Sequence, residues 1–383
     1  MAESESALLG TRGRTVVDSP PTIYDVAKRA GVSIATVSRA LNSTSTVRPS
    51  TRAKVVAAME QLEFVPNSVA RGLSSGKHWI LGLVFMRAPT DGSVLAVEEA
   101  SLLYTDIVIR GAETRAAERG YSLLLSSAYD THPSGITSLL NLTGTVDGLI
   151  VLDRVLDDEE VAYLARRIPI VLLAGKGESP SAITIRVDNE QAMRSLAQHL
   201  VNVHDISRVG FVAGDKKSPD SVARVNAFRQ AIDELGATLN DADLLEADWT
   251  SGVAEAVMHA RVARSEPLPQ AFVCANDQMA IGVIYALNAT GLKVPADIVV
   301  TGFDDITLTR YFNPSLTTIR QSGGLLGEAA VDALVAVLDD AKDVVRTVVL
   351  PTELVVRASC GCAEDSGSRS PVTEVAVPRR EVG

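Results

Sequence analysis

The stretch TIYDVAKRAGVSIATVSRALN (Thr22–Asn42) decides the first domain of this 383-residue chain. Apolar residues recur in it at the spacing of one helix face, first before Gly31 and again after it. These residues are Val26, Ala27, Ala30, Val37, Ala40 and Leu41. Ser33 stands where an N-cap residue would begin the second helix. Two short helices joined by a glycine-containing turn predict a helix-turn-helix unit.

A third helix is expected to complete this first domain. After a polar loop over residues 42–47, Pro49 stands near a helix start and Pro66 near its end. Val55, Ala58, Met59 and Leu62 form the apolar face between the two prolines. We therefore expect a small all-α domain over residues 21–65.

The chain after this domain alternates short apolar runs with helical segments. The expected strands are Ile80–Phe85, Ser122–Ser126, Gly148–Leu152, Ile170–Leu173, Val209–Ala213, Ala271–Cys274, Val299–Thr301 and Val348–Leu350. Nearly continuous Val, Ile and Leu runs indicate strands buried on both faces, hence parallel α/β sheets. Residues 79–360 would overfill one sheet. We therefore expect two lobes, 79–185 plus 322–349 and 186–321 plus 350–360, with a ligand cleft between them.

The remaining segments are expected to be linkers or tails. Residues 1–20 and 361–383 are predicted to be disordered, and residues 66–78 form a hinge and linker. The tail has no heptads that would favour a tetramer. The first residues lack the pattern of a secretory signal, and no apolar run is long enough for a membrane span. With three cysteines and no disulfide framework, we expect a cytoplasmic protein without membrane contact.

The charge is divided unevenly along the chain. The formal net charge is −11, yet residues 22–77 hold eight Lys or Arg against three Asp or Glu. A small basic domain joined to a large acidic body is typical of a protein that touches a polyanion at one end only. This distribution favours a nucleic-acid partner for the first domain.

Several kinds of chemistry are disfavoured by the sequence. It contains no GxGxxG, GxxxxGK[ST] or HExxH motif. Its five histidines do not cluster with cysteines or acids at metal-ligand spacing, and Cys360-Gly361-Cys362 has no second cysteine pair. We therefore expect no enzyme activity, no catalytic residue, no cofactor and no metal, and inert thiols in the Cys360–Cys362 segment.

The strings along the chain resemble the LacI/GalR family of transcription regulators. They are Thr22–Asn42, VRPSTRAKVVAAMEQLEFVPNSVARGL (Val47–Leu73), VDNE (Val187–Glu190), CANDQMAIG (Cys274–Gly282), VPADIVVTGFDDI (Val294–Ile306) and NPSLTTIRQ (Asn313–Gln321). They cover roughly residues 22–360 in the order that the family uses. The resemblance implies a helix-turn-helix headpiece with a hinge helix, followed by a two-lobe α/β body like that of periplasmic binding proteins. The pair Ile34-Ala35 makes the headpiece most similar to the catabolite-control type.

The second helix of such a headpiece reads base edges in the major groove with the side chains near its N-terminus. Here these are Ser33, Ile34, Ala35, Thr36, Ser38 and Arg39. Arg39 can bond a guanine with two donors, whereas Ile34 and Ala35 can make only apolar contacts. The resemblance implies DNA-backbone contacts at Thr22, Ile23, Tyr24 and Asn42. It also implies hinge contacts at Asn67, Ala70 and Leu73, with Leu73 wedged into the minor groove. We expect this hinge to fold only when two copies pair on DNA.

The body is expected to bind a small effector, and the resemblance implies a sugar or sugar derivative. Family positions that hold effectors fall on Arg224, Trp249, Asn276 and Asp304. A guanidinium can hold a diol or carboxylate, an indole can stack on a sugar ring, and the amide and carboxylate can bond hydroxyls. Met86 and Ala174 stand where some sugar-binding members have polar contacts. The segment Arg87–Leu103 is also longer than the family norm, so the effector's identity does not transfer.

The sequence thus predicts a homodimeric regulator, by default a repressor, that binds a palindromic operator through Thr22–Leu73 under control of a small molecule. A periplasmic-type sugar-binding protein shares the body but has a secretory signal and lacks a basic headpiece. A third alternative is a regulator controlled by a partner protein. A shift in melting temperature with a sugar would favour small-molecule control over this last alternative.

Overall fold

The computed structural model describes residues 21–42, 47–64, 77–87, 103–129, 135–152, 155–174 and 179–362. The chain divides into two compact units, Met1–His78 and Trp79–Gly383, which are treated separately below. The lead-in, the tail from residue 363 on, the hinge positions Asn67, Ala70 and Leu73, and most of the long segment 87–103 lie outside the described residues. Gly361 and Cys362, which were expected to begin the disordered tail, belong instead to the structured body. Among the helices described, none has the length and apolarity needed to cross a bilayer.

The first unit contains the expected helices α1 (Ile23–Ala30), α2 (Ile34–Asn42) and α3 (Pro49–Leu62). Its core consists of the buried residues Val26, Ala27, Val37, Ala40, Val55 and Ala58. Helix α1 ends where Gly31 turns into the left-handed conformation at φ 66°, which glycine adopts at little cost. The apolar periodicity therefore predicted this unit correctly.

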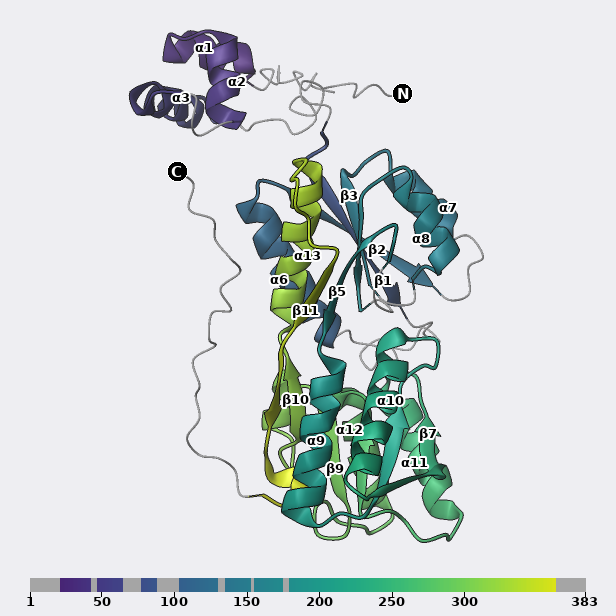
Figure 1. Cartoon of the computed structure of the whole chain (residues 1–383). Coiled ribbons are helices and arrows are strands. Elements are labelled where there is room, and N and C mark those ends of the chain that lie inside the picture. The colour runs from purple at the N-terminus through teal and green to yellow at the C-terminus, as the bar shows by residue number, and fades with distance from the viewer. Residues whose placement is uncertain are drawn as a thin grey trace, which may run out of the picture. The chain divides into compact units, whose positions relative to one another are not determined.

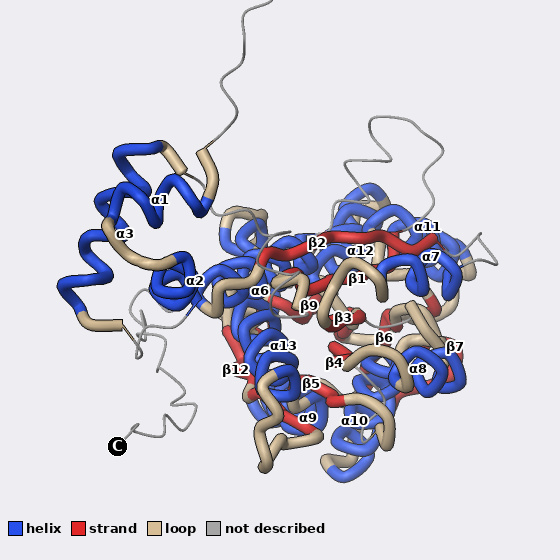
Figure 2. The backbone as a smooth tube through the Cα atoms, turned by 90° about the horizontal axis from the view of Figure 1, so that it is seen from above, coloured by secondary structure: helices blue, strands red, loops and turns tan. Residues whose placement is uncertain are grey.

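The second unit contains two six-stranded sheets, each with helices on both faces (Figures 1 and 2). The first has the order β11-β5-β4-β3-β1-β2, and all its neighbouring strands pair parallel. Its strands are β1 (Ile80–Arg87), β2 (Ser122–Tyr129), β3 (Gly148–Val151), β4 (Ile170–Leu173), β5 (Ile183–Val187) and β11 (Thr347–Leu350).

The second sheet has the order β12-β10-β9-β8-β6-β7. Its strands are β6 (Arg208–Ala213), β7 (Thr238–Glu246), β8 (Ala271–Cys274), β9 (Val299–Asp304), β10 (Thr317–Gln321) and β12 (Thr352–Val355). These strands also pair parallel, except that the edge strand β12 runs antiparallel to β10. The expectation of parallel α/β sheets is therefore confirmed, and β12 is the one described strand that pairs antiparallel, where the chain enters the second sheet for the last time.

Each sheet is covered by pairs of helices. The first sheet carries α6 (Leu103–Glu118), α7 (Gly135–Leu142), α8 (Asp158–Ala165) and α13 (Gly323–Leu338), and the second carries α9 (Asn189–His204), α10 (Pro219–Glu234), α11 (Ser251–Ala263) and α12 (Asp277–Ala289). Short 3-10 turns, η1 (Thr307–Arg310) and η2 (Ala358–Cys360), follow β9 and β12. Helices α6 and α13 lie side by side (Figure 1). The two helices can approach closely because Gly111 has no side chain. A Cβ at this position would stand 2.1 Å from the Gly324 carbonyl oxygen.

All eight strands expected from the sequence form, with ends that differ by a few residues at most. Four further strands, β5, β7, β10 and β12, carry polar or charged residues that hid the apolar pattern. In β10 the polar residues are buried, and tertiary partners satisfy them: the Thr317 hydroxyl donates to the Arg357 carbonyl at 2.9 Å, and the Thr318 hydroxyl donates to Asp277 at 2.6 Å. The sequence of β10 alone could not predict these partners, because both are distant along the chain.

The chain passes from one sheet to the other after β5, after β10 and after β11. The carboxyl ends of both sheets face the junction between the lobes, because residues from these ends line a common pocket there. Parallel sheets place ligands at the carboxyl ends of their strands. The fold thus brings together residues that are far apart in sequence.

Candidate functional site

The N-terminal end of α2 is held by local hydrogen bonds that leave its outer side chains exposed. The Ser33 hydroxyl accepts the backbone N–H of Thr36 at 3.2 Å and lies 2.9 Å from the Thr36 hydroxyl. Ser33, Ile34, Ala35 and Arg39 are exposed, whereas Thr36 and Ser38 are half-buried. The structure therefore presents a short row of polar and small apolar groups on the outer side of α2, as a recognition helix requires.

Of the predicted backbone-contacting residues, Thr22 and Tyr24 are exposed at the start of α1. The Asp25 carboxylate accepts the backbone N–H of Thr22 at 2.8 Å and its hydroxyl at 2.7 Å. These hydrogen bonds from Thr22 lower the pKa of Asp25. Tyr24 is 67% exposed, while Ile23 packs against the core of the headpiece. Asn42 closes α2, and its side chain lies outside the described residues.

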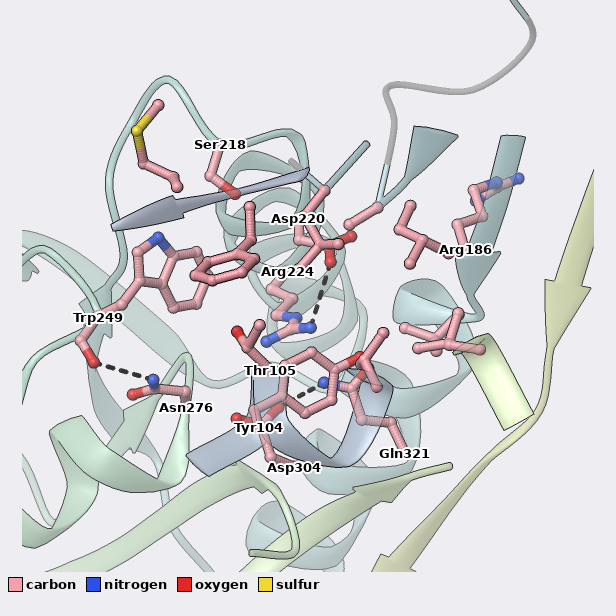
Figure 3. A pocket seen from close by; sticks show the side chains of 18 of the residues that line it. Tyr104, Thr105, Arg186, Ser218, Asp220, Arg224, Trp249, Asn276, Asp304 and Gln321 are labelled. Carbon is pink, nitrogen blue, oxygen red and sulfur yellow. Dashed lines mark hydrogen bonds and ion pairs between the residues drawn. The ribbon is translucent and has the colours of Figure 1, made fainter. Parts of the chain in front are cut away.

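The second candidate site is a pocket of about 200 Å³ between the two lobes of the body. Its walls include the ends of β1, β4 and β5 from the first lobe. The second lobe contributes the end of β9 and residues that follow β6, β7 and β8. Figure 3 shows Arg224 in the middle of this space, with Trp249 and Gln321 on opposite sides of it in that view. All four predicted effector residues line the pocket: Arg224, Trp249, Asn276 and Asp304.

Arg224 is held in place by a buried network. It lies on α10 and is 2% exposed. Its Nε donates to Asn189 Oδ1 at 3.0 Å, and a terminal nitrogen donates to the Ala275 carbonyl at 2.6 Å. The other terminal nitrogen is 3.5 Å from Asp220 Oδ2, while Asn189 also donates to Asp220 at 2.8 Å. The guanidinium also lies 3.5 Å from the centre of the Phe303 ring, so its position and charge are fixed without a ligand.

Asn276 and Trp249 form a second, linked element of the wall. Asn276 Oδ1 accepts the backbone N–H of Met279 at 2.9 Å, capping α12, and its Nδ2 donates to the Trp249 carbonyl at 3.0 Å. Trp249 has φ 78°, and its ring packs so closely on Gly214 that a Cβ there would lie 2.3 Å from the indole. Asn276 therefore caps a helix and positions Trp249, whose ring lines the pocket.

Asp304 supplies a carboxyl group at the end of β9. It is buried, and one of its oxygens accepts a hydrogen bond from Gln321 Nε2. Burial raises the pKa of Asp304 to about 7, although the Arg224 charge and the Gln321 hydrogen bond favour the ionised form. The carboxyl is therefore poised to titrate near neutral pH and can act as donor or acceptor toward a ligand.

Sequence reasoning missed several pocket residues. These are Tyr104, Thr105, Arg186, Ser218, Asp220, Gln278 and Gln321. The only local signal was the four-residue spacing between Asp220 and Arg224 on α10, which places the two side chains on one helix face. Met86 and Ala174, noted as departures from sugar-binding relatives, both line the pocket as the resemblance implied.

The expectation that the histidines do not cluster with cysteines was wrong for His199 and His204. The ligand atoms of His199, His204, Cys360 and Cys362 all lie within 4.8 Å of one another. Spacing along the chain could not reveal the cluster, because more than 150 residues separate the histidines from the cysteines. The cluster is formed only when β12 and η2 fold back against α9.

Comparison with known proteins gives matches over both units. Residues 22–67 match the model for bacterial regulatory proteins of the lacI family, and residues 197–360 match a periplasmic binding protein-like domain. Catabolite control protein A of Priestia megaterium is 33% identical over 318 residues, covering 82% of this chain and 91% of the relative. The HTH-type transcriptional repressor PurR of Photobacterium profundum is 31% identical over 342 residues, covering 88% and 98%.

Solved structures show the same architecture. The lac repressor dimer bound to operator and the anti-inducer ONPF has a TM-score of 0.72 and 29% identity, covering 89% of this chain and 99% of that one. The complex of the transcriptional regulator CelR with cellobiose has a TM-score of 0.64 and 25% identity, covering 88% and 99%. These relatives are transcriptional regulators, not enzymes. With its helix-turn-helix headpiece and two-lobe effector-binding body, the chain belongs to the lacI family of DNA-binding transcriptional regulators.

Proposed function

We propose that this protein is a homodimeric repressor that binds a palindromic operator through Thr22–Leu73 and responds to a carbohydrate-like effector in the inter-lobe pocket. The pocket carries this proposal, because polar side chains from both lobes line it and Arg224 is held in place before any ligand arrives. A ligand that contacts both lobes binds one lobe angle more tightly than another and so shifts the balance between them. In this proposal the favoured angle decides whether two hinge segments can pair on DNA.

The chemistry of the pocket supports a neutral, hydroxyl-rich ligand. Two arginines, Arg186 and Arg224, face two acids, Asp220 and Asp304, and the four charges cancel when Asp304 is ionised, above a pH of about 7. The Trp249 indole offers an apolar face, and Gln278, Gln321 and Asp304 offer bonds to hydroxyls. A balanced set of charges around one aromatic ring suits a sugar better than a strongly charged ligand. The cellobiose bound by CelR is consistent with this class.

The headpiece supports the DNA-binding half of the proposal. One α2 can read a single half-site through Arg39 and its neighbours, so a two-fold dimer would read a palindrome whose half-sites are spaced by the dimer. The lac repressor structure is a dimer bound to operator. Because its target is chromosomal DNA, we expect this regulator to act in the cytoplasm.

The test is a selection of fragmented genomic DNA on the purified full-length protein at moderate salt, followed by sequencing of the retained fragments. We expect a few palindromic sites, release from these sites by a sugar, and a melting-temperature shift with the same sugar. Diffuse binding that disappears with salt, with or without sugars, would contradict operator recognition. Specific sites without a response to any sugar would instead favour control by a partner protein.

A further inference from the structure

The cluster of His199, His204, Cys360 and Cys362 lies away from the pocket. Both histidines are in the last two turns of α9, and the cysteines belong to η2 and the residue directly after Gly361. The other end of α9 is Asn189, which holds Arg224 in the pocket. A 16-residue helix is about 22 Å long from first to last Cα. Figure 1 shows η2, in yellow, beside the end of α9 that is remote from the first lobe.

The four ligand atoms come together in one small region, all within 4.8 Å of one another. His199 Nε2 and His204 Nε2 are 3.2 Å apart, and Cys360 Sγ is 3.4 Å from His199 Nε2. Cys362 Sγ is 3.4 Å from His204 Nε2 and 3.9 Å from His199 Nε2. Zinc with ordinary bond lengths in a regular tetrahedron would place two nitrogens about 3.3 Å apart and a nitrogen and a sulfur about 3.6 Å apart. The four separations above differ from these ideal values by about 0.3 Å at most.

The backbone turn at Gly361 brings the side chains of the two cysteines toward each other. Gly361 adopts φ 93°, a conformation that residues with a Cβ rarely adopt. This turn allows the sulfurs of Cys360 and Cys362 to face the same point. Cys360 is buried, whereas Cys362, His199 and His204 are half-buried. An ion could therefore enter from solvent and then be enclosed by protein ligands.

Hydrogen bonding accounts for this arrangement only through weak contacts. A neutral imidazole has one N–H, so two Nε2 atoms 3.2 Å apart can share only one proton between them. The Cys360 thiol also donates to the Arg357 carbonyl at 3.3 Å, but thiols are weak donors. A cation at the centre would accept lone pairs from both imidazoles and both thiolates. We propose that these four residues form a structural Zn²⁺ site of the Cys2His2 type.

The donor set selects the metal. Thiolate and imidazole ligands suit Zn²⁺, whereas Mg²⁺ and Ca²⁺ prefer oxygen ligands. Four protein ligands at tetrahedral corners leave no open position for a substrate or water, which is typical of structural rather than catalytic zinc. The ion would tie the last described segment of the chain to the end of α9. This site is independent of the proposed operator and effector.

The first test measures metal in untagged full-length protein purified under reducing conditions without chelator. We expect about one zinc per chain by elemental analysis. Removing the zinc should lower the melting temperature of the body, and adding Co²⁺ to the metal-free protein should give the visible absorption of tetrahedral cobalt bound to thiolate. Absence of stoichiometric zinc after Zn²⁺ addition and dialysis, together with a cobalt spectrum like that of the free ion, would overturn the proposal.

The second test uses variants with matched controls. The double variant Cys360→Ser, Cys362→Ser and the single variant His204→Gln should lower the zinc content at least tenfold. Cys274→Ala replaces a buried cysteine outside the cluster, and His259→Gln replaces an exposed histidine on α11; both should keep full zinc. Full zinc in the double variant would overturn the assignment. Because the wild-type cobalt spectrum needs no variant, a ligand variant that misfolds does not obscure the result.

Discussion

The N-terminal end of α2, proposed to read DNA, and the inter-lobe pocket, proposed to bind an effector, differ in the exposure and the hydrogen-bond partners of their side chains. At α2 the functional side chains are adjacent in sequence and exposed, and their local hydrogen bonds stay within their own helix and its cap. In the pocket they come from widely separated segments, are buried, and bond to each other. Binding and folding are therefore nearly separable in α2, whereas in the pocket the same groups serve both.

The physical reason for the difference is the nature of each ligand. A DNA groove is a large surface that meets exposed side chains, so these can remain solvated until the complex forms. A small effector must be surrounded, which requires polar groups to be buried before it arrives. Buried polar groups must find partners within the protein. Changes in the pocket should thus alter stability as well as response, whereas changes at the exposed positions Ile34, Ala35 and Arg39 of α2 should alter DNA binding alone.

The largest effect is expected for Arg224→Ala. Removing the guanidinium leaves Asp220 without its buried cation and Asn189 without one partner, so the free energy of unfolding should fall by about 3 kcal/mol. Response to effector should also be lost. Chemical denaturation and sugar-induced release from the operator measure the two effects. Arg229→Ala on the same helix removes an exposed ion pair with Asp241 and should change neither the stability nor the response. Equal stability of the two variants would contradict the claim that the buried pocket residues also stabilise the fold.

The second effect concerns Asp304→Asn in the ligand-free protein. Because the pKa of Asp304 is about 7 in the folded state against 3.8 ordinarily, the folded state holds its proton to higher pH. Wild-type stability should therefore fall, relative to the variant, as pH rises from about 4 to about 7, and then level off. Thermal unfolding at pH 5 and pH 8 measures this difference. The variant should still bind operator but lose the sugar response; normal induction would refute the placement of Asp304 in the effector site.

The third effect is on DNA binding alone. Arg39→Ala should weaken binding to the selected operator by about 1–3 kcal/mol and remove sequence preference, leaving weak, salt-sensitive binding through phosphate contacts. Its melting temperature should equal that of the parent, because Arg39 is exposed. Titrations against operator and scrambled DNA at two salt concentrations measure the change. Lys54→Ala on α3 is the control for loss of charge and should weaken binding to both DNAs equally.

The smallest effect is expected for Ser33→Ala, which tests whether the residue that caps α2 contributes to stability as well as to DNA binding. Ser33 caps the helix through the Thr36 N–H, so its loss should cost about 1 kcal/mol of headpiece stability. Ile34→Ala should leave the stability of the headpiece unchanged, since Ile34 is 40% exposed. Hydrogen exchange of the α2 amides compares the two variants. Identical protection in both would show that the cap does not stabilise the helix.

The expectations from sequence were correct where a feature depends on neighbouring residues, as in α2, and incomplete where it depends on distant segments, as in the pocket. The headpiece helices and eight of the strands were predicted because each depends on a periodicity carried within a few residues. Strands β5, β7, β10 and β12 were missed because polar or charged residues interrupt their apolar pattern. In β10 these residues find partners only in the folded protein. Asp220 and Gln321 were missed as pocket residues for the same reason, since each acquires its role from a neighbour on another element.

A basic three-helix headpiece followed by an α/β body could be predicted from the amino-acid sequence alone, as could the residues proposed to read DNA, because contiguous patterns and family strings are local properties of the chain. The folded structure was needed to show that Asn276 caps a helix and positions Trp249, and that burial raises the pKa of Asp304. It also decided that His199 and His204 meet Cys360 and Cys362. The burial of side chains and the meeting of residues distant in sequence depend on how separate segments pack, which the spacing of residues along the chain does not predict.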